Sequence, residues 1–380
     1  MSPRIFFSRR PFHRYTLLLA GILAFVPAST ATSPGASVMT LQAPKDARLP
    51  RAVIDAAGTV HLIFVRGEMK NGNLLYARHE PGESAWSTPE PINSQPETVT
   101  GVGPIDGGQI ALSGDDRLHV VWFQMSPTRF FYTRSSANGP GFEPQRSIGT
   151  ENEEGVEAGP AVAADELKNI YVFWHAGAVE DAHRAVSMTV SHDGGTTFNP
   201  PRLISAEREG ACMCCSLAAA TDEAGTVYAA YRGAGENIRR GLRLLTSHDG
   251  GQAFSDQLIH PWRFGACPVS TTAMSGTRIA WETNRQIYMA DVDQTDAAIS
   301  PTAKSIYRRK NPAVAVNHRG ETLLVWGDGL GWKSGGTLHW QLFDAYGQPM
   351  REPGGGTDMI PDGSVPTAIA RPDGTFLIIF

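Results

Sequence analysis

The sequence has 380 residues, 33 Lys and Arg against 38 Asp and Glu, and a formal net charge of −5 at pH 7. Its 40 glycines, 16 phenylalanines and 8 tryptophans are spread among short apolar runs, which favours strands and turns and excludes an isolated helical domain. No basic run follows the first 31 residues, which argues against nucleic acid and anionic membranes as partners.

Residues 1–31 have the pattern of an export signal. An arginine-rich start precedes a short apolar core at 15–26 and a small-residue cleavage site at 29–31. The apolar core is too short to remain as a membrane span. Within the start, Ser-Arg-Arg-Pro-Phe at 8–12 is similar to a twin-arginine signal, which exports folded proteins, and an ordinary secretory signal is the alternative. We therefore expect residues 32–380 to form the mature domain, periplasmic or secreted.

A repeated strand pattern follows in the mature domain. A small-residue strand, a polar turn and a β-branched or aromatic strand recur at 50–64, 216–231, 312–326 and 367–380. Turns of this kind fall 44 to 58 residues apart, near Gly58, Asp116, Lys168, Gly225, Gly276, Gly320 and Gly374. This interval fits one four-stranded blade per repeat, so the sequence predicts an all-β fold, a single β-propeller with seven blades, or six as the alternative. Because the chain ends directly after the seventh turn, we expect residues 37–41 to close the ring.

The motif Ser-His-Asp-Gly-Gly-x-x-Phe occurs twice, at 191–198 and 247–254. Its aspartate can accept hydrogen bonds from N–H groups of its own turn, and its glycines supply backbone angles that other residues resist. The motif resembles the Asp-box of the bacterial neuraminidase (sialidase) repeat. That resemblance implies that both copies lie on outer hairpins, facing away from the propeller axis.

All four cysteines lie in one short stretch of sequence. Cys212, Cys214 and Cys215 precede the inner strand of one predicted blade, and Cys267 precedes that of the next, so we expect their sulfurs to meet at one mouth of the central channel. Thiolates, with Met213 as a further candidate ligand, suit Cu(I), and four thiolates also suit Zn(II). We favour copper over zinc. The alternative is disulfides alone, from Cys212 or Cys214 to Cys267, which leaves Cys215 without a well-placed partner and requires no metal.

The repeats as a whole resemble the sialidase superfamily. In that family an Arg-Ile-Pro arginine grips the substrate carboxylate, and Arg48-Leu49-Pro50 resembles it; Arg232 resembles the second substrate-binding arginine. We interpret both as packing or surface arginines. Sialidases use a tyrosine nucleophile assisted by a glutamate, but the equivalent stretch here, 210–217, holds thiols instead. We therefore expect no sialoside hydrolysis. The chain is also similar to an exported subgroup of sialidase-like proteins with Cys-x-Cys-Cys and a later Cys-Pro.

Three hypotheses about function follow. We favour a non-enzymatic exported protein whose cysteine cluster binds a soft metal ion or acts in thiol redox chemistry. The second hypothesis is an exo-glycosidase of the sialidase superfamily that acts on a small glycan, which requires two carboxylates at the channel mouth. The third is a disulfide-stapled scaffold that binds a glycan, or a protein partner on the propeller face.

Overall fold

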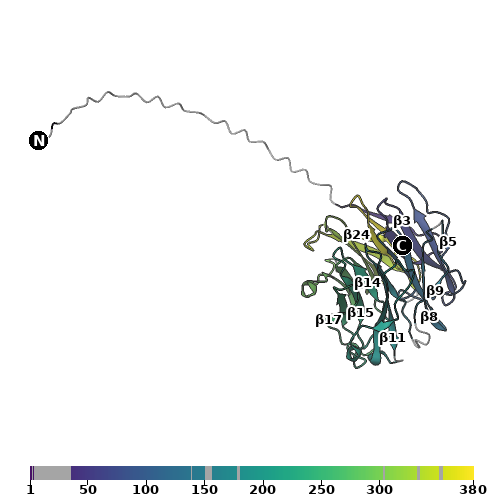
Figure 1. Cartoon of the computed structure of the whole chain (residues 1–380). Helices are drawn as coiled ribbons and strands as arrows, with labels where there is room; N and C mark the ends of the chain where they lie inside the picture. The colour runs from purple at the N-terminus through teal and green to yellow at the C-terminus, as the bar shows by residue number, and fades with distance from the viewer. Residues whose placement is uncertain are drawn as a thin grey trace. The chain divides into compact units, whose positions relative to one another are not determined.

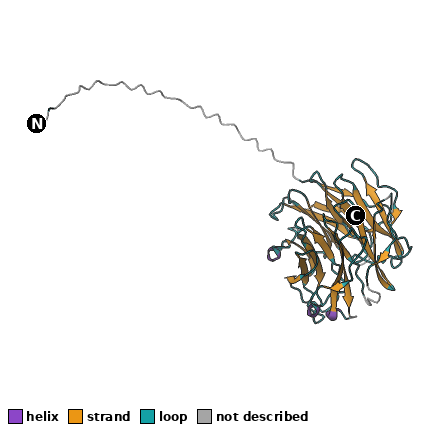
Figure 2. Ribbon diagram, in the orientation of Figure 1, coloured by secondary structure: helices purple, strands orange, loops and turns teal. Residues whose placement is uncertain are grey.

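Seven small sheets account for most of the described chain, six made of consecutive strands and the seventh of the last two strands and the first (Figures 1 and 2). The computed structural model describes residues 1, 3, 36–137, 139–149, 156–177, 180–302, 304–331, 334–350 and 354–380. The export signal predicted for residues 1–31 lies almost wholly outside these ranges. Residues 36–380 form one compact unit.

Each blade begins with an inner strand that lies beside the inner strands of its two neighbours. The inner strands are β2 (Arg48–Ile54), β6 (Gly108–Leu112), β10 (Ala161–Ala164), β14 (Ala218–Thr221), β18 (Thr272–Ser275), β21 (Arg309–Val316) and β25 (Thr367–Ala370). The second strands are β3 (Val60–Gly67), β7 (Leu118–Met125), β11 (Ile170–Gly177), β15 (Val227–Arg232), β19 (Arg278–Thr283), β22 (Thr322–Asp328) and β26 (Phe376–Ile379).

The outer part of each blade is more variable. The third strands are β4 (Gly72–His79), β8 (Thr128–Arg134), β12 (Arg184–Ser191), β16 (Leu242–Ser247), β20 (Gln286–Asp291), β23 (Gly336–Phe343) and, in the seventh blade, β1 (Val38–Leu41). Five blades add a fourth strand: β5 (Glu90–Pro91), β9 (Arg146–Ser147), β13 (Arg202–Leu203), β17 (Ser255–His260) and β24 (Gly354–Ile360). Three short 3-10 turns are η1 (Asp181–His183), η2 (Glu207–Glu209) and η3 (Thr295–Ala297).

The seven-blade prediction is confirmed, and the six-blade alternative is wrong. Inner strands contact each other in chain order, and β25 of the last blade contacts β2 of the first, so the ring is closed. The strand predicted at residues 37–41 is β1, which pairs in parallel with β26 from Val38 opposite Phe376 to Leu41 opposite Ile379. This pairing between the two ends of the domain covers an edge that would otherwise be exposed.

Four tryptophans occupy equivalent positions in their blades and pack between neighbouring sheets. Trp122, Trp174, Trp281 and Trp326 lie on second strands, and each is at most 1% exposed. Burial of such large side chains between sheets is a major source of stability. The inner strands instead carry mainly alanine and other small residues toward the axis, because seven strands converge there and leave room for little more.

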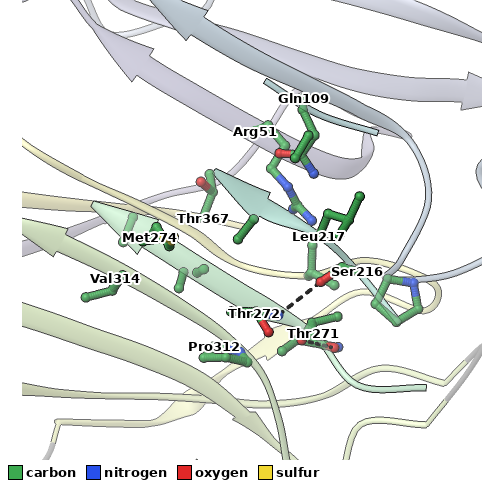
Figure 3. Close-up of a pocket in the computed structure, with 18 of the residues that line it drawn as sticks. Arg51, Gln109, Ser216, Leu217, Thr271, Thr272, Met274, Pro312, Val314 and Thr367 are labelled. Carbon is green, nitrogen blue, oxygen red and sulfur yellow. Dashed lines mark hydrogen bonds between the residues drawn. The ribbon is translucent and has the colours of Figure 1, made fainter. Parts of the chain in front are cut away.

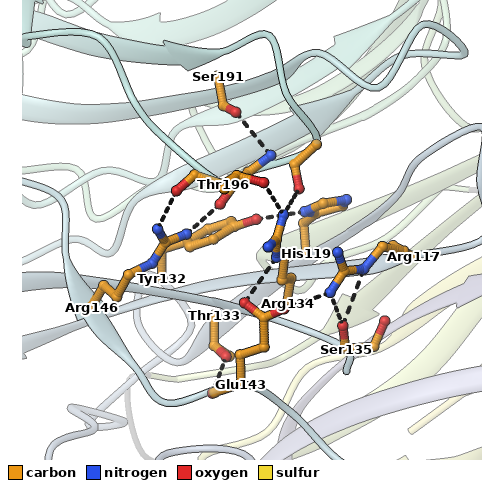
Figure 4. Close-up of polar contacts among 12 residues, drawn as sticks. Arg117, His119, Tyr132, Thr133, Arg134, Ser135, Glu143, Arg146, Ser191 and Thr196 are labelled. Carbon is orange, nitrogen blue, oxygen red and sulfur yellow. Dashed lines mark hydrogen bonds and ion pairs between the residues drawn. The ribbon is translucent and has the colours of Figure 1, made fainter. Parts of the chain in front are cut away.

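Both copies of the Ser-His-Asp-Gly-Gly-x-x-Phe motif, called boxes below, lie on outer hairpins, between β12 and β13 and between β16 and β17, as the sequence predicts. In the first box, Asp193 Oδ1 accepts hydrogen bonds from the backbone N–H groups of Thr196 at 2.9 Å and Thr197 at 2.8 Å. Gly195 has φ +78°, and a Cβ there would collide with the hydroxyl of Tyr132. Arg146 on β9 of the preceding blade donates to the carbonyls of the box (Figure 4).

The second box repeats this contact between blades. Arg202 on β13 donates to the carbonyl oxygens of Gly251 and Gln252, just as Arg146 does one blade earlier. The motif phenylalanines also reach the preceding blade: the Phe198 ring lies 4.8 Å from that of Tyr132 in an edge-to-face contact. The two boxes therefore join neighbouring blades at the rim, far from the inner strands.

Candidate functional site

The segment 210–217 that carries three of the cysteines is held in place by backbone hydrogen bonds from two blades. Cys212 N–H donates to Arg232 O at 2.8 Å, and Met213 O accepts from Ala158 N–H at 3.0 Å. Gly210 has φ +58°, and a Cβ there would lie 2.7 Å from the carbonyl oxygen of Asp181. Only glycine fits this approach, so the backbone turns sharply just before the cysteines.

The sulfurs meet as the sequence predicts, three of them in one group and that of Cys215 beside Cys212. Cys214 and Cys267 form a disulfide between two adjacent blades, with a sequence separation of 53. The Cys212 Sγ lies 3.4 Å from the Cys214 Sγ and 3.3 Å from the Cys215 Sγ. The Sγ atoms of Cys212, Cys214 and Cys267 are all within 4.8 Å of one another.

The cluster is buried except at one end. Cys212, Cys214 and Cys215 are almost fully buried, whereas Cys267 is exposed. The cysteines share a small apolar cluster with residues from several blades: Ile105, Ala158, Ala234 and Val269. Among the four cysteines, Cys267 is therefore the one that is open to solvent.

The two free thiols have opposite environments. Burial raises the pKa of the Cys215 thiol, but the Cys212 hydrogen bond, the Arg232 charge and the Ser270 donors outweigh it and bring the pKa to about 7. Ser270 contributes both its N–H and its hydroxyl, each 3.4 Å from the Cys215 Sγ. For Cys212 the hydrogen bond with Cys215 and burial raise the pKa well above its ordinary value. Cys215 is therefore the thiol that ionises first.

Met213, the further candidate ligand, is fixed by its backbone more than by its side chain. Its N–H donates to Asp181 Oδ1 at 3.1 Å, and its Sδ lies 4.0 Å from Nη2 of Arg184. Asp181 also forms an ion pair with Arg240, with Oδ2 2.8 Å from Nη1. This pair adjoins the sulfur cluster, and sequence reasoning missed it because Asp181 comes from a 3-10 turn on the preceding blade.

Arg48, the first sialidase-like candidate, is half-buried and bonds to backbone. Its Nη2 donates to Gly67 O at 2.7 Å and its Nη1 to Gly101 O at 3.3 Å. Both contacts lie within the first two blades, which agrees with a packing role.

Arg232, the second candidate, is 1% exposed and joins two blades. Its Nη2 donates to Glu282 O at 2.6 Å and its Nε to Ser270 Oγ at 3.1 Å. The guanidinium also lies 5.4 Å from the ring centroid of Trp262. Because Ser270 in turn contacts the Cys215 sulfur, Arg232 belongs to the surroundings of the thiol cluster.

The central channel opens beside this cluster. Ser216 and Leu217, which follow Cys215 in the chain, line a cavity of about 220 Å³ whose walls come from all seven blades (Figure 3). A second cavity of about 380 Å³ continues along the axis. Among the described residues, no aspartate or glutamate lines either cavity. The single charged side chain in the first cavity is Arg51, which sequence reasoning missed, although it interrupts a small-residue pattern shared by the inner strands.

No helix in the described part of the chain is both long and apolar enough to cross a membrane.

Comparison with known proteins gives a fold. No protein-family model and no curated protein matches the sequence. An α-L-arabinofuranosidase from Fusarium graminearum is 11% identical, with 80% of this chain and 94% of that chain covered and a TM-score of 0.52. The Trypanosoma rangeli sialidase is 10% identical, with 76% and 53% covered and a TM-score of 0.50. The Hadza microbial sialidase is 12% identical, with 80% and 69% covered and a TM-score of 0.49.

At these identities the likeness establishes a shared propeller fold and nothing about activity.

Proposed function

We propose that this chain is an exported, non-enzymatic propeller protein whose cysteine cluster binds one soft metal ion, with copper(I) favoured over zinc. The observation that carries the proposal is the convergence of the Cys212, Cys214 and Cys267 sulfurs within 4.8 Å of one another, with the Cys215 sulfur 3.3 Å from that of Cys212. Three thiolates at one point form a donor set that copper(I) prefers.

The surroundings favour a negatively charged metal–thiolate group. Three thiolates around one copper(I) ion carry a net charge of −2, and burial of such a charge is costly without nearby cations. Arg232 reaches the cluster through Ser270, and Arg240 borders it on the side of Cys212. These two arginines supply the compensating charge, and the thioether of Met213 is the further candidate ligand.

Metal binding requires the Cys214–Cys267 disulfide to be reduced, because thiolates and not disulfides bind the metal. Reduction adds two electrons and two protons and yields two thiols. A twin-arginine signal would allow the metal to be inserted in the reducing cytoplasm before export. The disulfide and the metal complex are then alternative states of the same four sulfurs.

The experiment is a thiol titration of the unfolded mature protein without reductant, beside a metal assay of the folded protein. Four free thiols with about one equivalent of metal support the proposal. Cys212→Ser should then remove most of the bound metal, whereas Met213→Leu keeps all four thiols and measures the contribution of the thioether. Fewer than three free thiols together with no bound metal after anaerobic purification would refute it.

Thiol redox chemistry is a second candidate, favoured by the contact between free Cys212 and the disulfide. In a first step, the Cys215 thiolate takes the proton of Cys212, and the Cys212 sulfur then attacks the Cys214 Sγ across 3.4 Å and releases Cys267, which takes up that proton. In a second step, the Cys215 thiolate attacks the Cys212 Sγ across 3.3 Å and releases Cys214. The disulfide moves to Cys212–Cys215, and two protons pass to Cys214 and Cys267, so no external oxidant is needed.

Peptide mapping after rapid alkylation distinguishes the two candidates. A Cys212–Cys215 disulfide in part of the metal-free protein supports the transfer, and Cys215→Ser should instead trap the Cys212–Cys214 intermediate. If every preparation contains only the Cys214–Cys267 disulfide and binds no metal, a stapled scaffold for a glycan or protein partner is the better hypothesis. Among the described residues neither axial cavity is lined by a carboxylate, so the carboxylate pair that an exo-glycosidase requires has no candidate there.

A further inference from the structure

The axial cavity beside the cysteine cluster has an unusual charge distribution. Its lining residues are mostly alanine, valine, proline and small polar residues, and Arg51 on β2 is the single ionisable one among them. The cavity measures about 220 Å³. That is room for several waters at about 30 Å³ each, or for a small ion with part of its hydration.

The Arg51 guanidinium has no acid beside it in the described structure. Its Nη1 donates a hydrogen bond to the neighbouring Pro50 carbonyl oxygen at 2.9 Å. Other poorly exposed arginines do have an acid, for example Arg240 with Asp181 and Arg243 with Asp256, both at 2.8 Å. Burial lowers the pKa of Arg51 to about 10, so it keeps its positive charge at neutral pH.

The bulge at the start of β2 explains why this arginine reaches the axis. The pairing of β2 with β3 shifts between Arg48 and Arg51, and Leu49 has φ +54°. The shift lets Arg48 bond to backbone within the first two blades while Arg51 lines the channel (Figure 3).

Further hydrogen-bonding groups surround the same space. Gln109, Ser216, Thr272 and Thr367, from four different blades, also line the cavity. Ser216 Oγ already accepts a hydrogen bond from Thr272 N–H at 3.0 Å, so its own hydroxyl proton is free to donate elsewhere. A guanidinium has five N–H donors in a planar fork, which matches two oxygens of one anion.

We infer that the central channel binds a small oxyanion. Its negative charge pairs with the Arg51 guanidinium, and its remaining oxygens accept hydrogen bonds from the hydroxyl and amide groups of neighbouring blades. An uncompensated cation in a confined space is costly, and an oxyanion of this size removes that cost while it satisfies several donors at once. The site is independent of the sulfur cluster, since it uses none of the four cysteines. A tetrahedral oxyanion and a short carboxylate can both pair with a guanidinium and accept these hydrogen bonds.

The test is calorimetric titration of the purified mature protein with sulfate, phosphate and acetate, each at constant ionic strength in chloride. We expect one saturable site per chain for at least one of these ions. Binding of sulfate or phosphate alone identifies a tetrahedral ligand, and binding of acetate alone identifies a carboxylate. The absence of saturable binding for all three would overturn the inference.

Two variants and one control assign the binding to Arg51. Arg51→Gln should weaken the affinity for the anion at least tenfold. The affinity of Arg51→Lys should lie between those of the wild type and Arg51→Gln, because lysine keeps the positive charge and loses the planar fork of N–H donors. Arg78→Gln is the control, since Arg78 is exposed and pairs with Glu80 outside the cavity. The bound anion should also raise the thermal midpoint of the wild type but not of Arg51→Gln, whereas general salt effects act on both. Unchanged affinity in Arg51→Gln would refute the assignment.

Discussion

The Cys214–Cys267 disulfide should make a large contribution to the stability of the oxidised protein, and Cys267→Ser is the substitution that tests it. Cys267 is exposed whereas Cys214 is buried, so serine at position 267 removes the bond with little loss of packing. The same substitution at Cys214 would combine the lost bond with a buried hydroxyl and could not separate the two effects.

The magnitude follows from the sequence separation of 53 between the two cysteines. Closing a loop of that size lowers the entropy of the unfolded chain enough to stabilise the folded protein by about 4 kcal/mol at 25 °C. The loop includes the whole of β14, β15, β16 and β17, so the bond ties the start of one blade to the start of the next.

The assay is guanidinium unfolding followed by tryptophan fluorescence, with a metal chelator present throughout. Without reductant, Cys267→Ser should unfold at a clearly lower midpoint than the wild type. With reductant, the wild type should fall to the midpoint of the variant, and the variant should not change. Equal midpoints without reductant, or a difference that persists in reductant and chelator, would show that the bond is not the source of stability.

Three further predictions concern the rim and a buried carboxyl, and each is measured as a change in the unfolding midpoint. Asp193→Ala should cost about 1–2 kcal/mol, and more than Asp249→Ala, because Asp193 accepts four hydrogen bonds in its box and Asp249 accepts three; equal losses would contradict this. Gly195→Ala should cost about 3 kcal/mol, since its Cβ collides with a tyrosine hydroxyl, whereas Gly194→Ala at φ +65° meets open space and should cost about 1 kcal/mol. Burial raises the pKa of Asp106 from 3.8 to about 7, so the folded protein holds a proton that the unfolded chain has lost, and this group destabilises the fold as pH rises from about 4 to 7. Asp106→Asn should remove that part of the pH dependence, and an unchanged slope would exclude Asp106 as its source.

Much of the site's location could be read from the sequence once the blades were counted. Equivalent positions on consecutive blades are neighbours, so Cys212 and Cys267, each just before an inner strand, had to lie at the same end of the channel. The turns of the two boxes were equally predictable, because hydrogen bonds within the turn depend on residues only three or four positions apart. The partners of their phenylalanines were not, since those lie on the preceding blade.

The sequence by itself therefore determined the all-β class, the seven repeats, the closing strand at 37–41 and the convergence of the cysteines. Each of these depends on local pattern or on regular spacing along the chain. Only the tertiary structure decided which cysteine pairs with Cys267, because Cys212 and Cys214 lie only two positions apart and the sequence pattern does not distinguish them. It also decided the surroundings of Arg232 and Arg51. Sequence likeness compared Arg232 with a substrate-binding arginine, and the fold buries it beside Ser270 and the thiols. Arg51 interrupts the small-residue pattern of the inner strands, but the bulge that brings it to the axis is visible only in the pairing of β2 with β3.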